Sequence, residues 1–195
     1  PVAVTGSWDN TVRVWDLTTG QPIGEPLTGH TDTVEAVACT MLENRPVAVT
    51  GSWDNTVRVW DLTTGQPIGE PLTGHTDALE AVACSALDDR PVAVTGSADD
   101  TVRVWDLTTG QPLGQPLTGH TDTVKAVACT MLENRPVAVT GSWDNTVRVW
   151  DLTTRRATAK VLIDTPRSIA LTTTGDIAIG LHLDIALYRR QPHDH

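Results

Sequence analysis

Histidine and aspartate, side chains suited to acid–base chemistry and metal binding, recur in this sequence at a fixed interval. Three of each are repeated every 45 residues: His30, His75 and His120, with Asp54, Asp99 and Asp144. A catalytic site needs unlike groups placed together, such as an acid beside a base or a nucleophile beside its activator. Near-identical repeats supply rings of like groups instead, so we predict that the protein is not an enzyme.

The usual short motifs of catalysis and metal binding are not found. The sequence has no GxSxG elbow, no phosphate-cradling glycine loop, and no HExxH or CxxC. The C-terminal letters HDH, at 193–195, could bind a metal weakly, but a frayed chain end is the simpler interpretation. We therefore predict no catalytic residue, no metal site and no cofactor.

The three cysteines follow the same interval. Cys39, Cys84 and Cys129 each end the letters AVAC, which is the pattern of a small buried apolar residue. Equivalent positions in adjacent repeats should lie too far apart to bridge, and an odd number argues against a disulfide framework. A reducing compartment fits best, so we expect a cytoplasmic protein.

The chain is acidic, and its charge is unevenly distributed. The formal net charge is −10, and residues 1–154 carry 8 basic and 20 acidic side chains, whereas residues 155–195 carry 6 and 4. An acidic surface repels nucleic acid and anionic lipid. No apolar run approaches the roughly 18–20 residues of a membrane span. We expect neither nucleic acid nor a membrane as partner.

A repeat of 45 residues covers most of the chain. PVAVTGS begins at Pro1, Pro46, Pro91 and Pro136, and the fourth copy departs from the pattern after Thr154. A fixed period of this size indicates an architecture in which no single unit buries its face alone.

Each unit predicts four short β-strands. In one unit they are 33–39, 46–51, 56–61 and 66–72, separated by turn residues and marked by β-prone or alternating patterns. The last strand contains Pro67 and Pro71. Because proline cannot donate to a ladder, this strand should be the outer edge of its sheet.

The repeat resembles the WD-repeat β-propeller family. GH at 29–30, 74–75 and 119–120 precedes WD at 60–61, 105–106 and 150–151. That family builds four-stranded antiparallel blades from about 40–45 residues with a GH…WD signature. The chain is similar to the highly repetitive bacterial members, and the match covers residues 1–154. The resemblance implies an all-β propeller, here a partial ring of about 4–5 blades.

The resemblance also implies a buried hydrogen-bond tetrad in each blade. The implied sets are Trp60–Thr50–His30–Asp54, Trp105–Thr95–His75–Asp99 and Trp150–Thr140–His120–Asp144. A tryptophan N–H is a donor only, and a threonine hydroxyl can accept from it while donating onward to a histidine nitrogen. The histidines and aspartates would then be structural, not catalytic or metal-binding.

A second tryptophan per repeat is the leading candidate for binding a partner. Trp8, Trp53 and Trp143 stand in the turn between the second and third strands, and the copy that begins at Pro91 has Ala98 instead. The family places this turn on its upper face. Tryptophan in an exposed turn disfavours solubility and is enriched in interface hot spots. The alternative is that each indole packs on the neighbouring blade and caps the core.

Two positions at the start of the innermost strand differ between repeats. One holds Thr33, Ala78 and Thr123, and the other holds Glu35, Glu80 and Lys125. The family places both near the upper rim, so we include them among the candidate partner-binding residues. Neutral drift at exposed sites would produce the same differences.

The strand count predicts one propeller domain that does not close by itself. The predicted units are an incomplete blade at 1–28, with second, third and fourth strands, full blades at 29–73, 74–118 and 119–163, and a degenerate C-terminal capping blade at 164–195. In that last unit the predicted strands are 168–173, 176–182 and 185–190. We favour a C-terminal piece of a longer propeller protein, with a ring completed by a second copy or a small closed ring as alternatives.

Three functions remain open at this stage. The favoured one is a non-catalytic scaffold that binds a protein or peptide on the upper face. The second is a self-assembling propeller in which two chains complete one ring. The third is a glycan or small-ligand binder with repeated sites, in which the turn tryptophans stack on sugar rings.

Overall fold

The computed structural model describes residues 1–132, 134–164, 166–171, 177–181 and 185–188. Within these residues it contains strands and no helix, and the strands form antiparallel sheets. The all-β prediction is confirmed. None of the described segments is a helix long and apolar enough to cross a membrane.

Three sheets correspond to the predicted full blades. The first contains β3 (Val34–Leu42), β4 (Arg45–Ser52) and β5 (Val57–Asp61). The second contains β6 (Leu79–Leu87), β7 (Arg90–Ser97), β8 (Val102–Asp106) and β9 (Gln111–Pro112). The third contains β10 (Val124–Leu132), β11 (Arg135–Ser142), β12 (Thr146–Asp151) and β13 (Arg156–Leu162). In each sheet, neighbours in sequence pair with one another.

A smaller sheet lies at each end of this series. β1 (Val2–Gly6) pairs with β2 (Val12–Asp16) at the N-terminal end. β14 (Ser168–Leu171), β15 (Ile177–Gly180) and β16 (Ile185–Tyr188) form the C-terminal sheet. These strands overlap the three predicted for the degenerate unit. Residues 172–176, 182–184 and 189–195, which include the HDH letters, lie outside the described residues.

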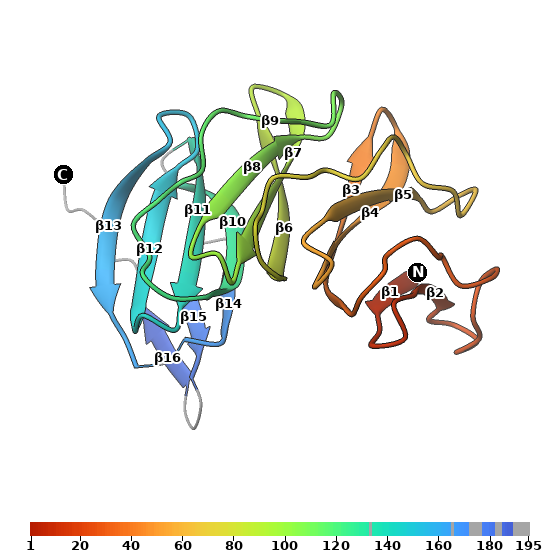
Figure 1. The fold of residues 1–195 in the computed structure, drawn as a ribbon, viewed down its shortest axis with the longest axis horizontal. Helices are drawn as coiled ribbons and strands as arrows, with labels where there is room; N and C mark the ends of the chain where they lie inside the picture. The colour runs from red at the N-terminus through yellow and green to blue at the C-terminus, as the bar shows by residue number, and fades with distance from the viewer. Residues whose placement is uncertain (133, 165, 172–176, 182–184, 189–195) are drawn as a thin grey trace.

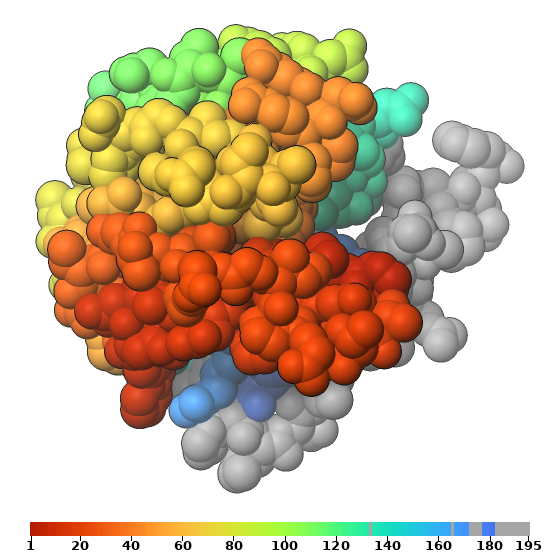
Figure 2. Space-filling view, turned by 90° about the vertical axis from the view of Figure 1, so that its right-hand side faces the viewer, coloured from red at the N-terminus to blue at the C-terminus, as the bar shows by residue number. Residues whose placement is uncertain are grey.

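The sheets follow one another as a partial ring (Figure 1). The innermost strands β3, β6, β10 and β14 are neighbours in that order. The N-terminal unit lies directly against the unit that follows it (Figure 2). The fold is therefore a partial propeller, as the sequence predicts.

The hydrophobic core lies between the blades and not within them. Val49 and Val59 of one blade pack in one cluster with Leu79 and Trp105 of the next. Trp60 and Trp150 occupy the equivalent place in the clusters on either side. Because each tryptophan completes the core of the preceding blade, no unit can bury its apolar face alone.

The outer strand is less regular than the sequence predicts. In the first full blade, only Pro67 and Leu72 of the predicted strand 66–72 form isolated bridges to β5. Ile68 and Leu72 donate to carbonyls of β5, at 2.8 Å each, but the prolines beside them have no N–H to donate. β13 contains no proline and pairs with β12 from Arg156 to Leu162, with one register shift at Thr158. The two prolines therefore contribute to the interruption of this ladder.

Candidate partner-binding surface

The predicted tetrad residues form a continuous hydrogen-bond chain in each full blade. In the first blade, Trp60 Nε1 donates to Thr50 Oγ1 at 2.9 Å. His30 Nε2 lies 2.8 Å from the same oxygen, and His30 Nδ1 lies 2.8 Å from Asp54 Oδ2. The second and third blades repeat these three contacts at 2.8–3.0 Å, through Trp105, Thr95, His75 and Asp99, and through Trp150, Thr140, His120 and Asp144.

The protonation states of the tetrad side chains follow from their burial and hydrogen bonds. Burial lowers the pKa of His30, so the neutral imidazole is favoured. Burial by itself would raise the pKa of Asp54, but hydrogen bonds from Thr56, Thr31 and His30 outweigh it and lower that pKa. A neutral histidine then donates from Nδ1 to a carboxylate and accepts from Thr50 at Nε2.

This histidine–aspartate pair is closed to substrates. The exposed fractions of the side chains are 0% for His30 and 7% for Asp54, and Thr50 is fully buried. A general base must reach the proton that it abstracts. The pair therefore supports the turn above it, where Thr56 Oγ1 donates to Asp54 Oδ1 at 2.6 Å.

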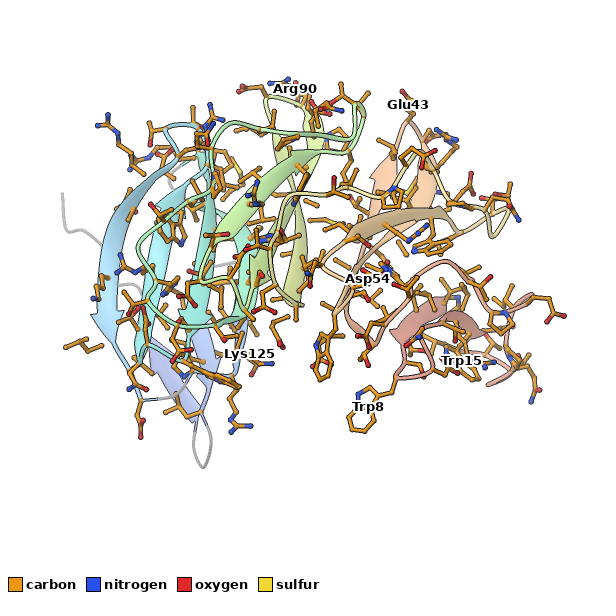
Figure 3. All side chains as sticks on the ribbon, viewed as in Figure 1. Trp8, Trp15, Glu43, Asp54, Arg90 and Lys125 are labelled. Carbon is orange, nitrogen blue, oxygen red and sulfur yellow. The ribbon has the colours of Figure 1, made fainter. Side chains whose placement is uncertain are left out.

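The tight turns present the second set of tryptophans on one face. We call this the upper face, although it is at the bottom of the view in Figure 3, where Trp8 and Lys125 are labelled. The opposite, lower face is at the top of that view and is marked by Glu43 and Arg90. The exposed fractions are 83% for Trp8, 43% for Trp53 and 45% for Trp143. Ala98, at the equivalent position, is only partly exposed.

The first of the two variable rim positions lies under the turns. Thr33 and Thr123 are buried, and Ala78 is partly exposed. The carbonyl of each accepts the N–H of the turn residue above it, as from Trp53 to Thr33 at 2.9 Å. This bond holds the residue beneath the turn, so the two threonine side chains take no part in the exposed surface.

The second variable position carries charges that differ in their contacts. Lys125 forms an ion pair with Glu80 of the preceding blade, and its Nζ lies 5.3 Å from the ring centroid of Trp143. Glu35 is exposed and has no ion pair among the described residues. Glu35 and Lys125 both line a cavity of about 290 Å³ at the centre of the ring, together with Arg167.

Further carboxylates of the upper face were not singled out from the sequence. Asp32, Asp77 and Asp122 are exposed, and each accepts the N–H of the next residue at 2.7–2.8 Å. None has an ion pair within the described part of the chain. Burial and the charges of Asp122, Asp99 and Asp144 raise the pKa of Asp100. In the sequence, the first three aspartates could have been recognised by the repeated letters HTD, and Asp100 by the letters SADD in place of SWDN.

Three carboxylates at strand ends near the lower face lie beside arginines. Asp61, Asp106 and Asp151 each lie near an arginine, with N–O distances of 3.8, 3.4 and 3.8 Å to Arg45, Arg90 and Arg135. Asp88 and Asp89, beside Arg90, are exposed and have no ion pair among the described residues, so unpaired carboxylates lie on both faces, and the upper face combines them with exposed indoles.

The cysteines are free thiols, and they are less buried than the sequence predicts, since two are partly buried and one is exposed. Cys84 and Cys129 pack against the core of the preceding blade, and burial raises the pKa of each to about 12. Cys39 is exposed. The sheet before it contains only β1 and β2, so no innermost strand covers this thiol. In the described residues, no group of three or more His, Cys, Asp or Glu side chains could hold a metal ion.

The fold and the repeated tetrads define the chain as a β-propeller protein. The family model described as "WD domain, G-beta repeat" matches residues 1–16, 20–61, 65–106 and 110–151, and the chain belongs to this WD40 family.

One solved structure shows the same fold. The crystal structure of the WD40 beta propeller domain of Doa1 matches with a TM-score of 0.81 and 23% sequence identity, covering 97% of this chain. The match covers 61% of that chain, so this sequence spans about three-fifths of its length. No curated protein sequence matches this chain.

Proposed function

We propose that this chain is a non-catalytic scaffold that binds a protein or peptide on its upper face. WD40 propellers generally mediate protein–protein interaction, and the family is generally non-catalytic. The observation that carries the proposal is the combination of exposed indoles with unpaired carboxylates on one face. Tryptophan anchors interfaces, and a field of one sign attracts partners of the other.

The charge of this face points to a cationic partner segment. Lys125 over Trp143 shows how an ammonium group is held here, between an indole ring and a carboxylate. The blade of Trp53 has Glu35 in place of that lysine. Trp53 and Glu35 therefore leave room for a lysine or arginine that a partner would supply. The free thiols are compatible with a cytoplasmic protein, which we retain as part of the proposal.

Selection from a random peptide library tests this proposal. We expect the recovered peptides to carry net positive charge and to lose at least fivefold in affinity with Trp53→Ala. Glu43→Ala, which removes an exposed carboxylate paired with Arg45 on the lower face, is the control and should leave affinity unchanged. Recovery of acidic peptides, or equal binding by Trp53→Ala and the unmodified chain, would contradict the proposal.

A further inference from the structure

Two equivalent grooves lie between neighbouring blades, on the outer side of the ring. The first is a cavity of about 270 Å³ lined by residues 23–28 of one unit and 62–67 of the next. The second, of about 380 Å³, is lined by the same positions one repeat later, 68–73 and 107–112. Each groove is lined by aliphatic, threonine and glutamine side chains and by one carboxylate, Glu25 in the first and Glu70 in the second.

The third copy of the groove is partly occupied by the chain itself. Gly65 and Gly110, on the walls of the open grooves, are replaced by Arg155 in the following repeat. The Arg155 guanidinium lies against Gly114, where an added Cβ would overlap it. At the equivalent Gly24 and Gly69, no surrounding atom lies within 4 Å of the place where a Cβ would stand. The space that remains beside Arg155 is about 150 Å³.

The backbone explains how an arginine can replace a glycine at this position. Gly65 and Gly110 have φ of 71° and 69°, and Arg155 keeps the same left-handed conformation with φ of 56°. Such a conformation is unfavourable for a residue that carries a Cβ. The turn is therefore preserved, and the side chain is the change that matters at this position.

The charge in the groove differs between the open and filled copies. Glu25 and Glu70 are exposed and have no ion pair among the described residues. The filled groove has the neutral Gln115 at the equivalent position. The glutamate is thus present where the groove is open and replaced by glutamine where the chain supplies its own guanidinium, and there Asp88 and Arg90 line the remaining space.

We propose that each open groove binds the side chain of an arginine from a partner polypeptide. In the first groove, the methylene stem lies on Ile23 and Leu62, and the guanidinium pairs with Glu25. Ile68, Leu107 and Glu70 play the same parts in the second. A planar fork with an apolar stem suits this lining better than the compact, strongly hydrated ammonium of lysine. This site is separate from the upper face and does not depend on the function proposed for it.

Nuclear magnetic resonance of the whole chain tests the proposal, with Nα-acetyl-arginine amide as the probe. Trp60 lines the first groove, Trp105 lines the second, and Trp150 stands at the equivalent position beside the filled copy. We expect the indole N–H signals of Trp60 and Trp105 to shift and that of Trp150 to stay unchanged. Nα-acetyl-lysine amide should bind at least fivefold more weakly. Equal shifts at all three indoles, or equal binding of both probes, would overturn the proposal.

Exchange of residues between the copies provides the reciprocal test. In Gly65→Arg, the indole N–H signal of Trp60 should no longer shift when the probe is added. The signal of Trp105 should still shift, which also shows that the variant is folded. Arg155→Gly combined with Gln115→Glu should make Trp150 respond. Glu70→Gln should weaken the response of Trp105 at least fivefold without changing that of Trp60. A Trp150 signal that stays unchanged in the opened variant, or a Trp60 response that survives Gly65→Arg, would refute the assignment.

Discussion

Replacing the central hydroxyl of one tetrad should destabilise the protein strongly. In the second full blade, Thr95 Oγ1 accepts from Trp105 Nε1 at 3.0 Å and lies 2.8 Å from His75 Nε2. Thr95 is fully buried, and the exposed fractions are 1% for Trp105 and 6% for His75. Thr95→Val keeps the shape of the side chain but removes the hydroxyl, which leaves two buried polar groups without a partner.

The magnitude follows from those two groups. A buried donor or acceptor left unsatisfied costs about 1–3 kcal/mol, so Thr95→Val should lower the free energy of unfolding by about 2–6 kcal/mol. Thr95→Ser keeps the hydroxyl and loses only a methyl group, so it should cost about 1 kcal/mol. The difference between the two variants in the free energy of unfolding therefore separates the contribution of the hydrogen bonds from that of side-chain packing.

The first unit supplies a matched control within the same chain. Trp15 Nε1 donates to Thr5 Oγ1 at 2.9 Å, but Thr5 is exposed, and no described histidine bonds to it. Water can replace the lost hydroxyl there, so Thr5→Val should change stability by no more than about 0.5 kcal/mol. Urea unfolding followed by far-ultraviolet circular dichroism and by tryptophan fluorescence measures both, and the two probes also detect unfolding in parts. Equal costs for Thr95→Val and Thr5→Val would refute the reasoning.

Two further predictions follow from the pKa shifts. Burial lowers the pKa of His30 and His120, so their neutral forms stabilise the fold above the ordinary histidine value of 6.5, and this contribution is lost as the pH falls below it. The urea concentration at the unfolding midpoint should therefore decrease as the pH is lowered from about 8 to 5.5. A midpoint that does not change over this range would contradict neutral histidines in the folded protein. An aromatic disulfide reagent at about pH 8 should modify the exposed Cys39 first: burial raises the pKa of all three thiols, but it raises those of the less accessible Cys84 and Cys129 to about 12. Cys39→Ser should remove the fast phase, and three thiols reacting at one rate would contradict this order.

Period and fold class could be predicted because they depend on residue types at fixed separations. The tetrad requires an N–H donor, a hydroxyl, an imidazole and a carboxylate, and a change at Thr50 or His30 would strand its buried neighbours. The same four residue types therefore occur in every full repeat, and their recurrence can be recognised from the sequence alone.

The exposed surface could be predicted only in part, because it depends on contacts across blades. The pairing of Lys125 with Glu80 joins residues that are 45 positions apart, and the sequence shows only a change of sign. Burial of Thr33 follows from a carbonyl that accepts a turn N–H, and no side-chain pattern reports this bond. The filling of the third groove by Arg155 likewise depends on where the preceding blade presents Gly114.

The hydrogen-bond chain of each tetrad links the two candidate surfaces. At one end, the ring of Trp60 forms part of the lateral groove. At the other end, Asp54 holds the turn that presents Trp53, through Thr56 and the backbone N–H of Thr31. A tetrad variant should therefore disturb both surfaces even where the chain still folds. A loss of binding therefore identifies a direct contact with a partner only when the substituted residue lies on one surface and binding at the other surface is retained.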